Sequence, residues 1–305
     1  MKDIKQIHQC KSQLGLSLIE LMISMVIGLI IIGAVLQAFL SSNQTYRIQE
    51  AQSRIQEDGR AAIRFLTRDI RMADFWGCIP DSSMITSQLN TLSAEYDPAQ
   101  HDFTTTGSIA GSDNTGLNGS DTLTIRGAVG NGIGIEEPTM PNTAAALHVQ
   151  DESGLVENQI VLVSDCIAGD IFQITNDPTT GSGSDDQAVH NGGTVSAGPG
   201  NTSNSLSQTY DTDAQIFGLQ ATSYALGTDT DGEPVLLRNG LELIQNVENM
   251  QILYGEDLDA DLSADSYLPA GAVTDMEQVV SIRISLLIRS TDQSLTSTAQ
   301  NYNYN

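Results

Sequence analysis

The chain has 305 residues, with 13 basic and 38 acidic side chains and a formal charge of −25. The charge is unevenly distributed. Nine basic and six acidic residues occur through Arg71, whereas four basic and thirty-two acidic residues follow from Met72 onward. A surface this acidic repels nucleic acid and anionic lipid, which argues against direct nucleic-acid binding by the larger part of the chain. The length allows one or two domains.

A polar segment of fifteen residues, which contains three lysines, precedes an apolar run from Leu16 to about Leu40. Roughly 25 apolar residues are enough to cross a bilayer as a helix. The basic flank predicts that the N-terminus stays in the cytoplasm and that the chain after the run is exported. Glu20 interrupts this run, and an ionised acid there costs several kcal/mol unless it is paired. We therefore expect a single membrane span with a functional acid near its start.

The segment from Ser41 to about Phe75 is predicted to continue as an amphipathic helix. Apolar residues between Ile48 and Ala73 recur at intervals of three, four or seven, which places them on one face. This face is expected to pack on the domain that follows. The same helix carries a stripe of four arginines, which indicates either a solvated face or contact with acidic neighbouring subunits; these are Arg60, Arg64, Arg68 and Arg71.

The remaining sequence alternates short β-type runs with polar, glycine-rich segments. Strands are predicted at 123–126, 160–163, 171–174, 214–226, 235–237, 250–254 and 280–289. Long loops are predicted at 104–120 and 177–213, where Gly, Ser, Thr, Asn and Asp are abundant. We expect one β-rich domain over 76–290 and a polar tail over 291–305. No nucleophile motif accompanies the histidines, so the sequence gives no support for an enzyme.

The stretch from Gly15 through Leu16 and Glu20 to Ile23 resembles the signal of type IV prepilins. The resemblance implies a leader at 1–15, cleavage between Gly15 and Leu16 by a prepilin peptidase, and N-methylation of Leu16. It also implies a mature helix over 16–75, of which about 16–40 spans the membrane. The new amine at Leu16 of a neighbouring subunit would pair with Glu20, and such a buried pair fixes register during assembly. Leu16 and Ser17 stand where Phe and Thr are usual.

Three further segments resemble the PilW-type minor pilins, namely 72–78, 163–174 and Tyr254-Gly255 with the aspartates after it. The resemblance implies an α+β, pilin-like fold, in which a long N-terminal helix packs on a disulfide-closed antiparallel β-rich domain with long loops. It implies a low-abundance subunit that helps to initiate assembly of a type IV pilus, at the tip, in support of adhesion, twitching motility or DNA uptake.

The partners implied are other minor and major pilins, the prepilin peptidase and the inner-membrane assembly platform. The implied location is the inner membrane, with the C-terminal domain in the periplasm, and afterwards the pilus. One alternative is a minor pseudopilin of a type II secretion system, which shares this design. A second alternative is a membrane-anchored module that binds a ligand or a cation.

Of the three cysteines, Cys10 leaves with the leader, and Cys78 and Cys166 remain. An even pair in an exported domain predicts a disulfide. The alternative is two buried thiols, and a metal pair lacks further ligands at suitable spacing.

Oxygen-bearing side chains recur at every second position in one loop, at Asp257, Asp259, Asp261, Ser263 and Asp265. This spacing suits calcium, which prefers six to eight oxygen ligands. The EF-hand template is broken, because Leu262 and Leu268 stand where glycine and the bidentate glutamate belong. A solvated acidic loop is the simpler interpretation, and no other cofactor is indicated.

Overall fold

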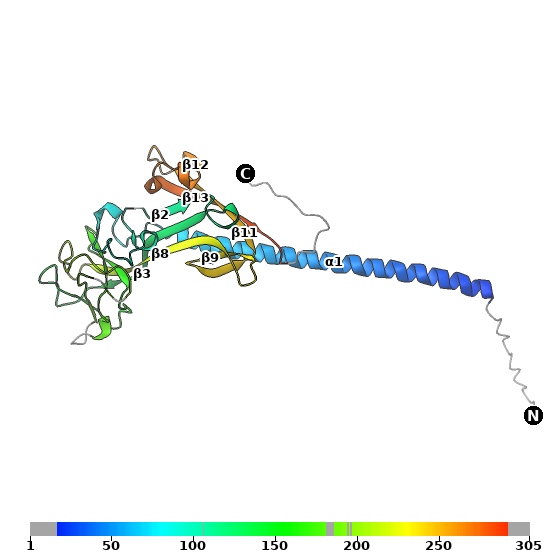
Figure 1. Cartoon of the computed structure of the whole chain (residues 1–305), viewed down its shortest axis with the longest axis horizontal. Coiled ribbons are helices and arrows are strands. Elements are labelled where there is room, and N and C mark those ends of the chain that lie inside the picture. The colour runs from blue at the N-terminus through cyan, green and yellow to red at the C-terminus, as the bar shows by residue number, and fades with distance from the viewer. Residues whose placement is uncertain (1–16, 106, 181–185, 194, 196, 292–305) are drawn as a thin grey trace, which may run out of the picture. The chain divides into compact units, whose positions relative to one another are not determined.

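The computed structural model describes residues 17–105, 107–180, 186–193, 195 and 197–291. The chain divides into two compact units, one of Met1–Arg54 with Ser290–Asn305 and one of Ile55–Arg289. A single helix, α1 (Leu18–Ile70), begins in the first unit and ends in the second. Every β-strand of the described residues lies in the second unit (Figure 1).

The part of α1 in the first unit has its large apolar side chains exposed, from Leu18 to Leu40. This stretch is long and apolar enough to cross a membrane. The apolar face predicted for the second half of the helix is buried only further along the chain. Ile48 is exposed, whereas Ala62 and Leu66 are fully buried in the core of the second unit.

Helix α1 ends at Ile70, five residues earlier than predicted, and a turn follows over residues 71–74. Asp74 ends the turn in the left-handed region, with φ of 61°. The turn then lies directly against the sheet, where the backbone N–H of Ala128 donates to the carbonyl of Phe75 at 2.6 Å. This approach requires Gly127, since a Cβ there would lie 3.0 Å from the carbonyl oxygen of Met72. The close packing of the turn explains why the helix ends where it does.

The largest sheet has eight strands built around β8 (Gln215–Thr228). One edge of β8 pairs with β3 (Thr122–Gly134), which pairs in turn with β2 (Ile109–Ser112). The other edge is shared by β5 (Ile160–Ser164) and β9 (Pro234–Arg238). The remaining members are β6 (Gly169–Gln173), β1 (Ile85–Ser87) and β10 (Leu241–Gln245). All pairs are antiparallel except β1 with β6.

Two smaller sheets complete the second unit. In the first, β11 (Val247–Glu256) pairs with both β12 (Ser266–Leu268) and β13 (Val279–Ile288). In the second, β4 (Leu147–Val149) pairs with β7 (Asp186–Ala188). Short helical turns occupy the connections, at Pro98–His101 (α2), Ser82–Met84, Leu117–Gly119, Pro178–Thr180, Ala270–Ala272 and Met276–Gln278.

Two main clusters of buried apolar side chains form the core. The helix-facing core joins α1 to β3, β8, β9, β11 and β13, and its fully buried members include Leu66, Leu123, Leu236 and Met250. The loop-facing core lies where β4, β5, β6 and β7 meet the start of β8, and includes Leu147, Val161, Phe172 and Ile216. A smaller cluster surrounds Trp76.

The α+β, pilin-like fold predicted from the sequence is confirmed, with a long apolar helix and an antiparallel β-rich domain closed by one disulfide. Every predicted strand is present, although β3 and β8 extend beyond the predicted bounds. The two segments predicted as long loops each contain a short strand, β2 and β7. The residues of these strands are mostly small or polar, so they lack the apolar alternation that identifies longer strands.

Candidate functional site: helix start, disulfide and acidic loop

The start of α1 holds the acid that the sequence analysis singled out. Glu20 lies in the first helical turn and is exposed, and its backbone N–H donates to the carbonyl of Ser17 at 3.0 Å. A carboxylate in this position is stabilised by the helix dipole. No cation lies within 4.0 Å of it among the residues that the structure describes. Gly15 and Leu16, the predicted cleavage and methylation positions, lie outside the described residues.

The two predicted cysteines form a disulfide between Cys78 and Cys166, with their Cα atoms 4.9 Å apart. The bond joins the segment that follows α1 to the hairpin loop between β5 and β6. Both cysteines are exposed. Because it closes a separation of 88 residues, the bond removes unfolded-state entropy worth about 4 kcal/mol.

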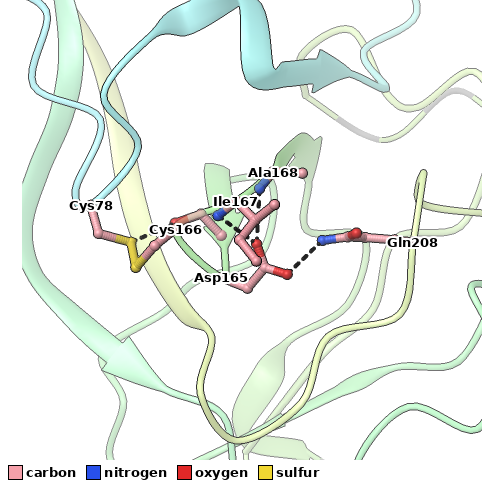
Figure 2. The surroundings of a disulfide bond; sticks show 7 residues. Cys78, Asp165, Cys166, Ile167, Ala168 and Gln208 are labelled. Atoms are coloured by element: carbon pink, nitrogen blue, oxygen red, sulfur yellow. Dashed lines mark hydrogen bonds between the residues drawn. A yellow bond between two sulfur atoms is a disulfide. The ribbon is translucent and has the colours of Figure 1, made fainter.

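Asp165 shapes the hairpin loop that carries Cys166, as Figure 2 shows. Its carboxylate accepts the backbone N–H groups of Ile167 and Ala168 at 3.0 and 2.9 Å, and the side-chain amide of Gln208 at 2.9 Å. Desolvation acts to raise the pKa of Asp165, but these donors outweigh it and lower the pKa below its ordinary value. The loop is therefore fixed with Cys166 in the left-handed region, at φ of 70°.

The acidic loop between β11 and β12 brings three of the five predicted calcium ligands together. Oxygen atoms of Asp257, Asp259 and Asp265 lie within 4.8 Å of one another. Asp261 is not part of this group, and its carboxylate accepts the backbone N–H of Ser263 at 2.8 Å. The every-second-residue spacing therefore brings together three of the four carboxylates.

The donor chemistry of the loop suits a hard cation, but its carboxylates already serve the loop backbone. Asp257 accepts the N–H groups of Ala260 and Leu262, each at 2.8 Å. Desolvation acts to raise the pKa of Asp257, whereas these backbone donors lower it, and the lowering prevails. Asp265 likewise accepts the N–H of Leu258. Three carboxylates carry six oxygens, the lower end of the six to eight that calcium prefers, and both oxygens of Asp257 and one of Asp265 already accept backbone N–H groups.

A contact that the sequence analysis missed attaches the end of α1 to the large sheet. Asp69 Oδ2 accepts the Tyr224 hydroxyl at 2.7 Å and Nε of Arg238 at 2.8 Å. The hydrogen bond to Asp69 raises the pKa of Arg238, and burial followed by the same bond raises the pKa of Tyr224. In the sequence, the one signal for this contact was the position of Asp69, an acid three residues after Leu66 and beside the buried face of the helix.

A second missed cluster lies in the loop-facing core around the fully buried Asp170. Its carboxylate accepts the Tyr210 hydroxyl at 2.8 Å, the Gln88 amide at 2.8 Å, and both the N–H and hydroxyl of Ser207. These donors come from segments far apart in the sequence. Asp170 therefore holds the 200–210 segment against β6, a role that no local pattern indicates.

Two protein-family models match the chain. The model of the prokaryotic N-terminal methylation motif matches residues 10–36, which include Gly15, Leu16 and Glu20. The model of type IV pilus-assembly protein W, PilW, matches residues 223–305. The resemblance to PilW-like type IV pilins is confirmed. No curated protein matches the chain, and no solved structure matches it either.

The PilW match begins in β8 and covers β9 to β13, together with the acidic loop. The methylation motif and the apolar helix α1 indicate a membrane-anchored pilin. The description of the matched family, a type IV pilus-assembly protein, relates this part of the chain to pilus assembly. The segments 72–78 and 163–174, which also resembled PilW, lie outside both matches, and so does the disulfide.

Proposed function

We propose that this chain is a minor pilin, a low-abundance subunit that helps to initiate assembly of a type IV pilus. The observation that carries the proposal is the presence of both family signatures on one chain, the methylation motif at 10–36 and the PilW match at 223–305. The fold supports it, because an apolar helix leads into a disulfide-closed β domain.

In this proposal the leader 1–15 is removed, Leu16 becomes the methylated N-terminus, and the helix anchors the subunit in the inner membrane until assembly. The domain over 76–290 is then periplasmic. Glu20 is exposed in the first turn of α1, where a neighbouring subunit can reach it. An amine at Leu16 of that neighbour would neutralise Glu20 in the apolar filament interior. The position at the tip, and roles in adhesion, twitching motility or DNA uptake, are part of the same proposal.

Mass spectrometry of the mature protein tests the proposal. We expect the N-terminal peptide to begin with methylated Leu16. An intact Met1 in membranes that contain an active prepilin peptidase would contradict it. Glu20→Ala provides the second measurement. The variant should reach the membrane at the wild-type level but fail to enter sheared filaments, because its carboxylate no longer pairs with the neighbouring amine. Glu50→Ala, also on α1, is the matched control and should assemble normally.

A minor pseudopilin of type II secretion remains the closest alternative, since it would show the same cleavage, methylation and anchoring. Deletion of the gene distinguishes the two functions. Loss of surface pili with normal secretion supports the pilus, and loss of secretion with normal piliation supports the pseudopilus.

The clustered oxygens of Asp257, Asp259 and Asp265 are the observation that favours the other alternative, a cation-binding module. Calorimetric titration of the full chain with calcium tests it, with Asp259→Ala as the comparison. Heat that appears only in the unsubstituted chain would support a calcium site. Absence of heat would leave the loop as a solvated acidic turn.

A further inference from the structure

A groove of about 1390 Å³ lies in the second unit, between the last three turns of α1 and the sheets. One wall runs from Gly59 on α1 to Met72 in the turn that follows the helix, and the other wall comes from β3, β8, β9, β10 and β13. The pilin function proposed above does not use this groove.

The groove is strongly cationic in a chain that is otherwise acidic. Arg60, Arg64 and Arg68 of α1 line it, together with Arg71 in the turn after the helix and Arg238 of β9. Arg126 also borders it, but its guanidinium is buried and donates to the carbonyls of Pro98, Ala99 and Gly107 instead. Among the described lining residues Asp69 is the one carboxylate, and it is already bonded to Arg238 and Tyr224. Within the described part of the chain, no carboxylate lies within 4.0 Å of Arg64, Arg68 or Arg71. These guanidinium groups therefore have uncompensated charge.

Apolar side chains are interspersed with these charges. The groove is also lined by Ile63 and Phe65 of α1, by Met72 in the turn after it and by Val129 of β3, and each is 40–46% exposed. A ligand that matches this surface carries several carboxylates together with one or two exposed apolar side chains, because both kinds of contact are available side by side.

The acidic loop of this same chain has that chemistry. Asp259 and Asp261 are exposed, and Leu258 and Leu262 on either side of them are 61% and 85% exposed. Hydrogen bonds from the loop backbone to Asp257 hold the loop in one shape, which lowers the entropy lost on binding. The loop thus presents two carboxylates flanked by two exposed leucines.

We propose that the arginine groove of one copy receives the Asp257–Asp265 loop of a second copy of this chain. The two surfaces differ, so the contact is heterologous and can add copies head to tail. A single loop in a groove buries less than a standard interface, and the contact is therefore weak and sensitive to salt. The proposal goes beyond pilin function, since it needs only two copies of the β domain.

A charge swap tests the proposal with the full chain in a zwitterionic detergent and EDTA, which removes divalent cations. Sedimentation velocity should detect self-association at low salt and its loss at high salt. The groove variant Arg64→Glu/Arg68→Glu and the loop variant Asp259→Lys/Asp261→Lys should each weaken self-association by on the order of tenfold or more. A mixture of the two variants should associate again, because the reversed groove then meets the reversed loop.

Two controls make charge reversals elsewhere, one at a single arginine and one at two aspartates as in the loop variant. Arg54→Glu lies on α1 before the groove, and Asp151→Lys/Asp211→Lys alters exposed acids outside the acidic loop; both should associate as the unsubstituted chain does. Failure of the mixture to associate, or equal loss in the controls, would overturn the proposal. Binding to phosphatidylglycerol vesicles that depends on Arg64 and Arg68, without self-association, would overturn it in favour of a membrane surface.

Discussion

The helix-facing and loop-facing cores of the β domain are held together in different ways. The helix-facing core is enclosed by α1 and long strands, whose backbone groups pair with one another along β3, β8, β11 and β13. The loop-facing core is bounded by strands of three to five residues and by loops. Short strands leave many backbone groups without a ladder partner, and these groups must be satisfied in another way.

Buried polar side chains supply those partners in the loop-facing core. Asn201 accepts the N–H of Gln173 at 2.7 Å and donates to its carbonyl at 2.8 Å, so that one side chain replaces a strand neighbour. Gln173 in turn donates to the carbonyls of Asn158 and Ala197. This chain therefore builds one core from regular strand pairing and the other from individually placed polar side chains.

The largest expected effect concerns the covalent link between the segment after α1 and the β5–β6 hairpin. Replacing both cysteines, as Cys78→Ser/Cys166→Ser, should lower the free energy of unfolding by about 4 kcal/mol, because the unfolded chain regains the entropy of a long loop. Urea unfolding followed by fluorescence of the single tryptophan, Trp76, measures this. Reduction of the unsubstituted chain should reproduce the shift. A loss below about 1 kcal/mol would mean that polar contacts alone hold the loops.

The next effect isolates the helix-facing core. Leu66→Ala should cost about 3 kcal/mol of unfolding free energy, because the side chain is fully buried and leaves a cavity. Ile63→Ala, on the same helix but 42% exposed, is the matched control and should cost less than half as much. Equal losses in the two variants would show that packing of α1 contributes little to the stability of this core.

The smallest expected effect is a pH dependence of the unfolding free energy that arises in the loop-facing core. His190 is buried, lies against the ring of Phe172, and makes a 3.0 Å hydrogen bond through Nε2 with the carbonyl of Ala145. Burial lowers its pKa, although hydrogen bonds to the backbone and the charge of Asp170 oppose this. In the unfolded chain His190 therefore binds a proton near pH 6.5, whereas in the folded chain it does so only at lower pH. Stability is full above that pH and falls as the pH drops toward the lower folded value.

The contribution of His190 should not exceed about 1.4 kcal/mol per pH unit. Unfolding free energies at pH 7.5 and 5.5, compared between the unsubstituted chain and His190→Asn, measure it. The variant should lose less stability on acidification. The prediction is wrong if both lose the same amount.

The difference between the two cores also explains which features were predictable from the sequence. The apolar alternation of residues 280–289 identified β13, and the spacing of Ala62, Leu66 and Ile70 identified the buried face of α1, because regular elements repeat their pattern along the chain. The pairing of Cys78 with Cys166 was predictable because these two cysteines are the ones that remain once the leader is excluded. These inferences use residues close in sequence or a simple count.

The features that were not predicted depend on contacts between residues far apart in the sequence. Asp69 meets Tyr224 and Arg238 across more than 150 positions, and Asp170 gathers donors from two other segments. No local pattern distinguishes such acids from solvated ones. The acidic loop illustrates the converse, since its aspartates are evenly spaced in sequence but only Asp257, Asp259 and Asp265 lie together in the structure. Turns at Ala260 and Leu262, whose φ values are 63° and 67°, interrupt the extended backbone between them.

The exposed disulfide has one more consequence, for proteolysis. It encloses a stretch that contains Leu92, which is 94% exposed on a polar loop. A protease that cuts this loop produces two fragments that the cystine still joins, and strand pairing between β6 and β1 still holds the ends in place. In denaturing gel electrophoresis, nicked chains therefore migrate together as intact protein until a reductant separates the two fragments. Because of this bond, a single cleavage between residues 78 and 166 is detected only after reduction.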